Sequence, residues 1–363
     1  MNKISVLYNL HHLYYLPQFL PVIREMEKRG MFELYFSAVI DKDRIDHQLI
    51  KQALAAISGT FVDAKSEKAR QKEILARNFD VTVFGKSGHA DEYCSANTLA
   101  VLLYHGIGVK SCYYTDYNPR INVRYVEGQY RFDELKRRGV GTELVVTGCP
   151  KLDPLFESDN GVAILSELNL DPDRATILYA PTFYPSSIEV LGESIGELTA
   201  DYNLIVKLHH FSWMLKKYRH QKKLFQKLTR KYSHVHLLPV EEYSIIPFFK
   251  PADILLTEAS SVAFEFLATG KPVVISDICH LRKKHRIFHR QFQKKRLDTE
   301  MQRLLNFAYH FDNVSRLPGT LKTAMNEKSD YKNRTADLPE KYLGILDGKA
   351  SQRIVDDLIE RLK

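Results

Sequence analysis

Residues 252–275, ADILLTEASSVAFEFLATGKPVVI, decide the fold. An apolar strand is predicted at 253–256 and a helix at 261–269, and the GKP turn at 270–272 leads into the next apolar strand. A strand, a helix and a second strand in this order form a βαβ unit. Such a unit predicts a parallel sheet with helices packed on its faces.

The same alternation extends along the chain. Apolar runs predict strands at 4–8, 34–40, 81–84, 99–104 and 144–147, then at 176–180, 203–208, 234–238, 253–256 and 272–276. Helical patterns occupy 17–29, 44–57, 66–77, 188–200, 213–231, 242–249 and 261–269. Turn residues gather at 151–173. We therefore expect an α/β protein with two Rossmann-like domains facing across a cleft, at 1–160 and 161–335, and a closing helix at 336–363.

The composition is that of a soluble globular protein, with 363 residues of which 44% are hydrophobic and 26% charged. No apolar run approaches the roughly 18 residues of a transmembrane helix, and the first residues lack a signal-peptide cleavage site. The four cysteines form no CxxC pair, so neither a disulfide framework nor a zinc site is expected. A cytoplasmic location is the simplest expectation.

The positive charge is concentrated in two segments. The net charge is +8, and residues 216–231 and 280–297 each hold eight Lys or Arg and no acid. Such runs are either solvated helix faces or contacts with anionic partners such as phosphates, nucleic acid or an anionic membrane surface. No known nucleic-acid-binding motif appears, so no specific nucleic acid is expected. The sequence does not indicate an oligomeric state.

Two serines stand where a helix begins after the strand at 253–256. Ser260 and Ser261 occupy the N-cap region, where free backbone N–H groups and hydroxyls favour a diphosphate; an ordinary N-cap is the alternative. Glu265 lies one turn further on the same face, in the apolar stretch VAFEFLA. Its carboxylate is a candidate acceptor for ribose hydroxyls, and a solvated carboxylate is the alternative.

A histidine follows the strand at 99–104, in the sequence LLYHGIGVK. The ordinary pKa of a histidine suits a general base, and His105 stands at a strand end where ligands collect. A hydrogen-bonded structural histidine is the alternative. Gly106 allows close backbone approach to a ligand, and Lys110 adds a cation.

The strand at 203–208 ends in a second cationic group, in the sequence NLIVKLHH. Lys207 and His209 are candidates to bind an anion at this strand end, and chance histidines in a loop are the alternative. His209 and the adjacent His210 make a poor metal pair, because neighbouring residues rarely converge on one ion and no carboxylate is close in sequence. We therefore expect no metal site and no cofactor.

Taken in order, these motifs resemble the CDP-glycerol glycerophosphotransferase family, the teichoic-acid primases and polymerases of the GT-B fold. That family carries a double serine followed by Phe-Asp or Phe-Glu, and a His-Gly-Thr-x-x-Lys motif after a strand. Here Ile107 replaces the threonine. The family also reads Lys-x-His-Pro and Tyr-Ala-Pro-Thr, then an aromatic residue and an arginine; this chain has His210 for the proline and Tyr184 for the arginine.

The resemblance implies a role for each matched residue. His105 would take the proton of the acceptor hydroxyl, and His209 would stabilise the departing nucleotide. The donor side would comprise Lys207, Ser260, Ser261, Glu265, Thr182 and Glu258. The acceptor side would comprise Lys110, Gly106 and His11.

The expected reaction is transfer of glycerol phosphate, or a similar polyol phosphate, from a CDP-linked donor to a hydroxyl of a cell-surface glycan or lipid-linked acceptor. Cations and a helix dipole would replace a metal ion. The resemblance also suggests that 280–297 holds the protein on the inner face of the membrane. The alternatives are a GT-B glycosyltransferase using a nucleotide sugar, a nucleotide-sugar epimerase and a nucleic-acid binding protein.

Overall fold

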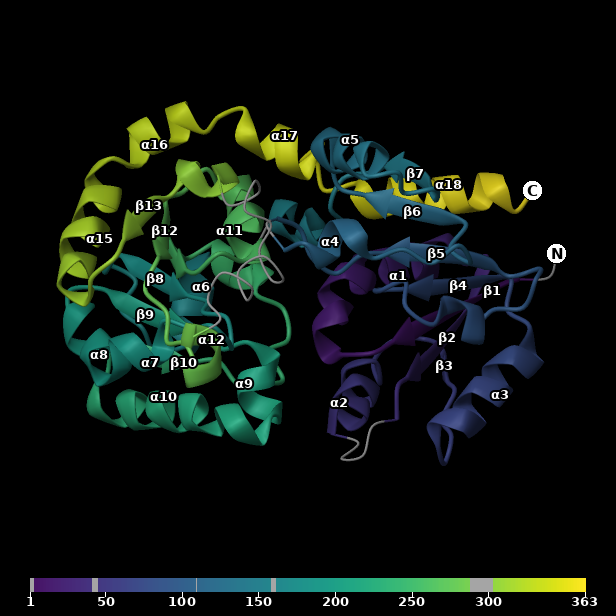
Figure 1. Cartoon of the computed structure of the whole chain (residues 1–363), viewed down its shortest axis with the longest axis horizontal. Coiled ribbons are helices and arrows are strands. Elements are labelled where there is room, and N and C mark those ends of the chain that lie inside the picture. The colour runs from purple at the N-terminus through teal and green to yellow at the C-terminus, as the bar shows by residue number, and fades with distance from the viewer. Residues whose placement is uncertain (1–2, 41–44, 109, 158–160, 288–302) are drawn as a thin grey trace. The chain divides into compact units, whose positions relative to one another are not determined.

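The computed structural model describes residues 3–40, 45–108, 110–157, 161–287 and 303–363 (Figure 1). The chain forms two compact units. The first comprises Met1–Gly106, Tyr113–Phe156 and Glu340–Lys363, and the second comprises Ile107–Cys112 and Glu157–Pro339. Within the described ranges, no helix has the length and apolar character needed to span a bilayer.

The first unit is built on a seven-stranded parallel sheet in the order β3-β2-β1-β4-β5-β6-β7. Its strands are β1 Ile4–Leu10, β2 Phe32–Ala38, β3 Thr60–Phe61, β4 Val81–Phe84, β5 Leu99–Leu103, β6 Val123–Val126 and β7 Glu143–Val146. The strand order reverses between β1 and β4, as in a doubly wound sheet. Ligands of such sheets bind at the carboxyl ends of the strands near this reversal.

Helices surround this sheet. They are α1 Leu16–Arg29, α2 Ile45–Ala53, α3 Glu67–Arg77, α5 Gln129–Arg137 and α18 Ala350–Arg361. The short helices α4 Cys112–Thr115 and α17 Leu338–Leu343 contain points where the chain passes between the units. The C-terminal α18 packs on α1, and the Arg29 guanidinium lies 2.7 Å from the Asp356 carboxylate. The last helix of the chain therefore belongs to the first unit.

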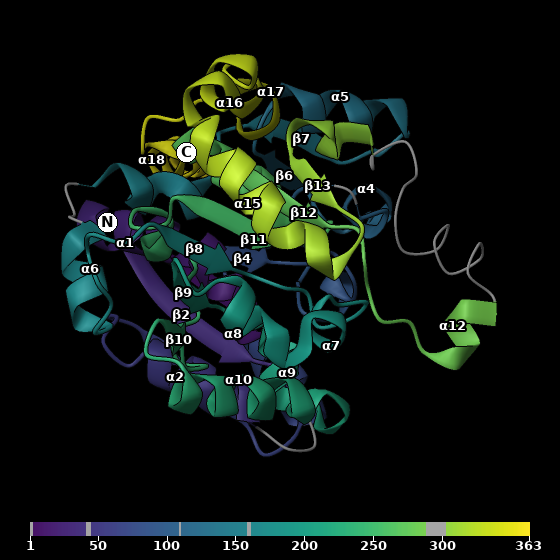
Figure 2. The same cartoon turned by 90° about the vertical axis from the view of Figure 1, so that its left-hand side faces the viewer.

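The second unit repeats the plan with a six-stranded parallel sheet in the order β10-β9-β8-β11-β12-β13. Its strands are β8 Thr176–Tyr179, β9 Asn203–Val206, β10 Val235–Leu237, β11 Ile254–Thr257, β12 Val273–Ser276 and β13 Tyr309–Phe311. Its helices are α6 Gly161–Glu167, α7 Ile188–Leu191, α8 Ile195–Leu198, α9 His210–Met214, α10 Arg219–Lys231, α11 Ser261–Glu265, α12 Lys283–Ile287, α15 Leu317–Asn326 and α16 Lys328–Arg334 (Figure 2). Two Rossmann-like α/β domains were predicted, and this prediction is confirmed.

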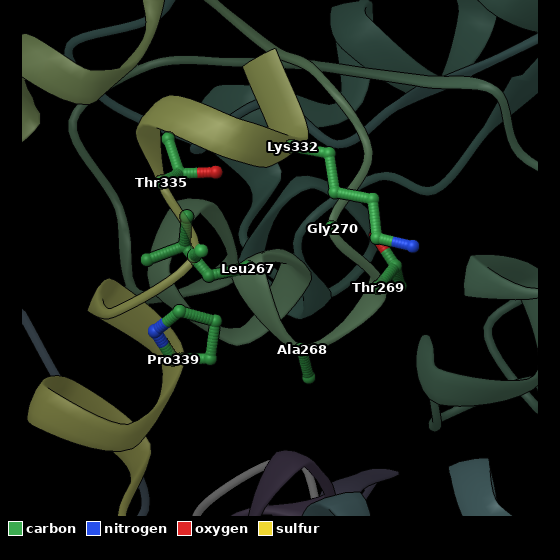
Figure 3. Close-up of a pocket in the computed structure, with 8 residues that line it drawn as sticks. Leu267, Ala268, Thr269, Gly270, Lys332, Thr335 and Pro339 are labelled. Atoms are coloured by element: carbon green, nitrogen blue, oxygen red, sulfur yellow. The ribbon is translucent and has the colours of Figure 1, made fainter. Parts of the chain in front are cut away.

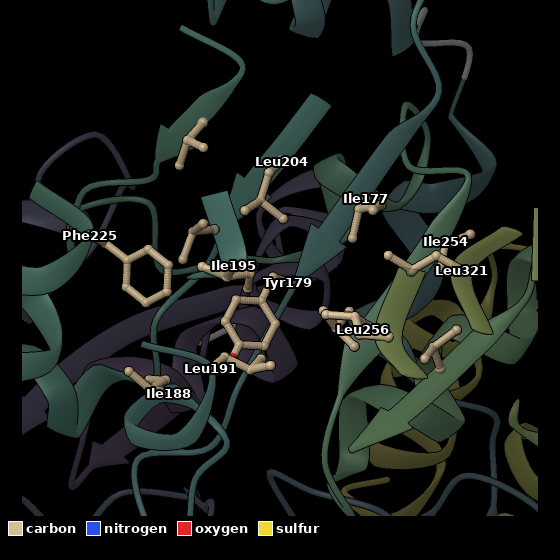
Figure 4. Close-up of a cluster of buried hydrophobic side chains, with 14 of the residues drawn as sticks. Ile177, Tyr179, Ile188, Leu191, Ile195, Leu204, Phe225, Ile254, Leu256 and Leu321 are labelled. Atoms are coloured by element: carbon tan, nitrogen blue, oxygen red, sulfur yellow. The ribbon is translucent and has the colours of Figure 1, made fainter. Parts of the chain in front are cut away.

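The core of the second unit fixes the positions of its loops. Side chains of β8, β9 and β11 pack against α7, α8, α10 and α15 (Figure 4). Tyr179 lies at the centre, fully buried, and its hydroxyl is 2.7 Å from the Ser187 hydroxyl. The core therefore reaches the loop that follows β8, which carries several candidate site residues.

Three predicted helices differ from the structure. The segment 213–231 is interrupted between α9 and α10, where Leu215 adopts an extended conformation before the short 3-10 turn Lys216–Tyr218. The segment 188–200 is likewise divided, at Gly192. The segment 242–249 forms only a 3-10 turn over Ile246–Phe249, which contains Pro247. Proline lacks the backbone donor that a longer helix would need there.

Three strands escaped prediction: β3, β6 and β13. The most instructive is β6, in which Arg124 interrupts the apolar pattern yet is 1% exposed. Its guanidinium donates to the backbone carbonyls of Tyr113 and Asp116 and lies over the Tyr104 ring. These tertiary partners offset the cost of burying the charged Arg124, which interrupts the apolar run of this strand.

Candidate active site

His105 follows β5 and lies among aromatic rings. It stacks on Tyr15 with ring centroids 4.5 Å apart and on Tyr104 at 4.8 Å, and Tyr14 approaches edge-on at 5.3 Å. Its Nδ1 is 2.9 Å from the carbonyl oxygen of Gly85, which follows β4. A carbonyl only accepts, so Nδ1 carries a proton, and in the neutral ring Nε2 carries the lone pair. The half-buried ring is thus fixed in the tautomer of a base acting through Nε2.

The glycines beside His105 are required by close packing. A Cβ atom on Gly85 would lie 2.4 Å from the Tyr15 ring, and one on Gly106 would lie 2.7 Å from the Tyr113 ring. The carbonyl of Gly106 accepts a hydrogen bond from the buried Arg131 at 2.9 Å. Gly106 therefore allows Tyr113 to close one side of the cluster around His105.

His11 follows β1 in the same unit, near a buried arginine. Burial, together with the nearby charge of Arg70, lowers the pKa of His11 to about 4, so its ring is neutral near pH 7. Arg70 is fully buried and donates to Asn9 at 2.7 Å and to Glu67. The side-chain nitrogen of Asn9 and Nδ1 of His11 are buried without hydrogen-bond partners among the described residues. The end of β1 thus offers uncharged hydrogen-bonding groups to a ligand.

The motif that contains His105 is shared between the two units. Ile107–Cys112 belongs to the second unit, whereas His105 and Gly106 belong to the first. Gly108 has φ +102°, and a Cβ atom there would lie 2.7 Å from the Phe264 ring of α11. Lys110 is half-buried in this segment. The loop after His105 therefore packs on the helix that carries the two candidate serines.

Glu258 is a buried carboxylate of the second unit and follows β11. It accepts hydrogen bonds from the backbone N–H of Thr182 at 2.6 Å, from the backbone N–H of Ser187 at 2.7 Å and from the Ser187 hydroxyl. Burial raises the pKa of Glu258 to about 7, although these hydrogen bonds favour the charged form. The Thr182 hydroxyl donates to the Pro185 carbonyl. Glu258 and Thr182 thus hold the loop between β8 and α7.

The two serines lie at the start of α11. Ser260 is the N-cap residue, and its hydroxyl is 3.0 Å from that of Thr257, which in turn donates to the Ala180 carbonyl. Ser261 is the first helical residue and is half-buried. Glu265 ends the helix and is 2% exposed, so its carboxylate lies inside the unit rather than in solvent.

The strand β9 delivers Lys207 and His209 to the same edge of the sheet. His209 caps α9, and its Nδ1 accepts the backbone N–H of Phe211 at 3.1 Å. Its ring packs on Phe183, which follows β8, with centroids 4.7 Å apart. Lys207 is half-buried directly after the strand. The loops after β8, β9 and β11 therefore meet at one edge, as the parallel topology requires.

Three further residues at this edge were not predicted. The guanidinium of Arg282 lies 4.5 Å from the Tyr184 ring centroid and 5.2 Å from that of Tyr218, and it donates to the Tyr218 hydroxyl. The Tyr184 hydroxyl accepts the backbone N–H of Arg282 and is 2.6 Å from Nδ1 of His285. Tyr184 stands where the family motif has an arginine. The structure brings Arg282 to it from a segment 98 residues away.

A pocket of about 350 Å³ lies elsewhere in the second unit (Figure 3). Its lining comprises Leu267, Ala268, Thr269, Gly270, Lys332, Thr335, Ala336 and Pro339. Gly270 precedes β12, so this pocket lies at the amino end of that strand, away from the edge with Ser260. In the part of the chain that the structure describes, no group of three or more His, Cys, Asp or Glu side chains is arranged to hold a metal ion.

A family model for CDP-glycerol:poly(glycerophosphate) glycerophosphotransferase matches residues 136–360, more than half of the chain. The chain belongs to this family. The predicted resemblance is thereby confirmed, and with it the assignment to a transferase family. The matched residues include Lys207, His209, Glu258 and the two serines, whereas His105 and His11 lie before the match.

Curated relatives within this family share part of their length with the chain. The teichoic acid glycerol-phosphate primase of Bacillus subtilis is 30% identical over 138 residues, which span 36% of this chain and 32% of the primase. The teichoic acid poly(ribitol-phosphate) polymerase of Bacillus spizizenii is 24% identical over 248 residues, which span 61% of this chain and 34% of that polymerase. The matches thus cover about a third of the length of these relatives.

Solved structures share the fold of the whole chain. The wall teichoic acid polymerase TagF superposes with a TM-score of 0.71 at 16% identity, covering 100% of this chain and 89% of that one. The UDP-GlcNAc 2-epimerase of Neisseria meningitidis superposes with a TM-score of 0.62 at 14% identity, covering 98% of this chain and 100% of that one. The predicted GT-B fold is confirmed. At these identities the likeness concerns the fold alone.

Proposed function

We propose that this glycerophosphotransferase-family chain transfers glycerol phosphate, or a similar polyol phosphate, from a CDP-linked donor to a hydroxyl of a glycan or lipid-linked acceptor. The observation that carries the proposal is the geometry of His105. Its Nδ1–H is bound to the Gly85 carbonyl, which keeps the lone pair on Nε2 as proton transfer requires. Family membership supports the CDP-linked donor.

In the proposed reaction, the acceptor oxygen attacks the phosphorus that carries glycerol. The bond from this phosphorus to the bridging oxygen of the diphosphate breaks, CMP leaves, and Nε2 of His105 takes the acceptor proton. Lys207 and His209 would stabilise the charge that develops on CMP. Ser260 and Ser261 would bind the diphosphate and Glu265 the ribose, while Glu258 and Thr182 shape the donor loop through the hydrogen bonds described above.

On the acceptor side, we assign His11, Gly106 and Lys110. The neutral His11 and the buried amide of Asn9 favour recognition of hydroxyl groups, because these side chains donate and accept hydrogen bonds without a net charge. We propose that the reaction proceeds without a metal ion, because cationic side chains supply the charge stabilisation. Contact with an anionic membrane surface through 280–297 also remains a proposal; residues 288–302 lie outside the described part of the chain.

The test is a transfer assay with radiolabelled CDP-glycerol, isolated Bacillus subtilis membranes as the source of acceptors, and EDTA. The proposal predicts incorporation of label into the membrane fraction with release of one CMP per glycerol phosphate. Parallel reactions with CDP-ribitol and UDP-N-acetylglucosamine test the alternatives. Transfer from the nucleotide sugar, with none from either CDP-polyol, would contradict the proposal and support a glycosyltransferase.

A further inference from the structure

Arg282 is an exposed cation held in place by two aromatic side chains. Its guanidinium lies over the rings of Tyr184 and Tyr218, and it donates to the Tyr218 hydroxyl at 2.5 Å. In the described ranges, no carboxylate lies within ion-pair distance of it. An exposed arginine ordinarily pairs with an acid or moves freely in solvent. Arg282 does neither, so its fixed position calls for another partner.

The backbone around Arg282 is also fixed to the loop that follows β8. The backbone N–H of His280 donates to the Ser186 carbonyl at 2.9 Å, and the two residues form an antiparallel bridge. The backbone N–H of Arg282 donates to the Tyr184 hydroxyl at 3.1 Å. These bonds join the segment after β12 to the loop that Glu258 holds. The cation is therefore positioned by its backbone as well as by its side chain.

Arg282 lies close to the candidate donor residues. Phe183 contacts both the Tyr218 ring, with centroids 5.2 Å apart, and the His209 ring, at 4.7 Å. Tyr218 thus contacts both Arg282 and Phe183. These two aromatic side chains link the Arg282 guanidinium to the histidine that follows β9.

We propose that Arg282 binds the diphosphate of the nucleotide-linked donor, with Tyr184 and Tyr218 as its positioning residues. This inference rests on the proposed function. A guanidinium offers planar, paired N–H donors that match two phosphate oxygens, and one of its donors is already used by Tyr218. Because two rings hold it in advance, little side-chain entropy is lost when the anion arrives. The arginine thereby supplies the cation that Tyr184 lacks.

The test is calorimetric titration of the full chain with cytidine, CMP and CDP-glycerol. The variants are Arg282→Gln, Arg282→Lys and Arg230→Gln; Arg230 is an exposed arginine of α10 and serves as a control with the same change of charge. Arg282→Gln is expected to weaken the binding of CDP-glycerol about 10- to 100-fold and to leave the affinity for cytidine within about twofold of the wild type. Arg282→Lys should recover part of the loss, and Arg230→Gln should match the wild type.

Tyr218→Phe provides a test of positioning, because it keeps the buried ring and removes the hydroxyl that accepts from Arg282. We expect about two- to fivefold weaker CDP-glycerol binding with unchanged cytidine binding. Equal CDP-glycerol affinity for Arg282→Gln and the wild type would overturn the inference while leaving the proposed function intact. If the wild type does not bind CDP-glycerol at all, the proposed function is overturned, and the inference that rests on it is overturned too.

Discussion

Three arginines of the first unit are buried, whereas Arg282 lies exposed near the candidate residues of the second unit. Arg70, Arg124 and Arg131 are each 2% exposed or less and give their N–H groups to carboxylates, an amide and backbone carbonyls of their own unit. In the second unit the buried groups are instead the carboxylates Glu258 and Glu265, and Arg282 remains exposed. Among the described Arg, Lys, Asp and Glu side chains that are at most 4% exposed, those of the first unit are arginines and those of the second are glutamates.

This difference fits two kinds of ligand. Buried arginines whose charge is already shared stabilise the fold but have little left for a ligand. The first unit offers the neutral His11 and the amide of Asn9, which suit an acceptor hydroxyl. The second unit offers Arg282, Lys207 and His209, which suit a diphosphate.

The largest expected effect concerns His105. His105→Ala should lower turnover about a thousandfold, because a positioned general base contributes about 10²- to 10⁴-fold. Binding of CDP-glycerol should stay within twofold, since the donor residues lie in the second unit. Steady-state kinetics and titration measure the two quantities. His89→Ala, at an exposed histidine of the same unit, is the control; near-normal turnover of His105→Ala would refute the base assignment.

The buried and exposed arginines should differ in their effect on stability. Arg70→Met removes the buried donor to the Asn9 side-chain oxygen and the ion pair with Glu67, and should lower the free energy of unfolding by about 2 to 3 kcal/mol. Arg282→Gln should change it by less than about 0.5 kcal/mol. Urea unfolding followed by far-UV circular dichroism gives both values. Equal free energies of unfolding for the two variants would contradict the expected difference between buried and exposed arginines.

Glu258 should make stability depend on pH. Its pKa is raised by burial from 4.5 to about 7, so the folded protein holds the proton more tightly than the unfolded chain. Stability from this group is therefore present below about pH 4.5 and is lost as the pH rises to 7. We expect a decrease of about 2 kcal/mol between pH 5 and 7.5.

The matched variants for this pH dependence are Glu258→Gln, which cannot titrate, and Glu193→Gln at an exposed carboxylate. Urea unfolding across this pH range should show the decrease in the wild type and in Glu193→Gln, and a flatter profile in Glu258→Gln. A decrease of the same size in Glu258→Gln would show that the pH dependence arises elsewhere.

The smallest expected effect is a difference between the pKa values of two histidines. Burial lowers the pKa of His11 to about 4, whereas the hydrogen bond to Asp277 raises the pKa of His310 above its usual value of 6.5. NMR spectra of imidazole-labelled protein should show His11 neutral at pH 6 and His310 protonated. His11→Gln and His310→Gln assign the two signals. A His11 signal that titrates near pH 6.5 would contradict the uncharged character of this end of the first sheet.

Parallel topology explains why much of the candidate site could be predicted. His105, Lys207, His209 and the two serines each follow an apolar strand, and strand order alone brings such residues to the carboxyl edge of their own sheet. The double serine could be recognised because it lies between an apolar strand and a helix, where Ser260 is the N-cap residue and Ser261 begins the helix.

The contacts that sequence reasoning missed are long-range. Arg282 contacts Tyr184 and Tyr218, which lie 98 and 64 residues away in the sequence. The residue pattern within one segment does not predict a contact between segments so far apart. Glu258 was predicted to bind the donor. In the structure its carboxylate accepts hydrogen bonds from the backbone of Thr182 and Ser187 and so supports the loop after β8, a contact between segments far apart in the sequence. The strand β6 was missed because Arg124 looked incompatible with a buried strand until its carbonyl partners were known.

The central claim is that the second unit of this chain binds a CDP-linked polyol. The most direct test is calorimetric titration of the full chain, in EDTA, with CMP, UMP, CDP-glycerol, CDP-ribitol and UDP-N-acetylglucosamine. We expect saturable binding of a CDP-polyol that is at least tenfold tighter than binding of the UDP-sugar. Tighter binding of UDP-N-acetylglucosamine, or loss of all nucleotide binding in EDTA, would contradict it.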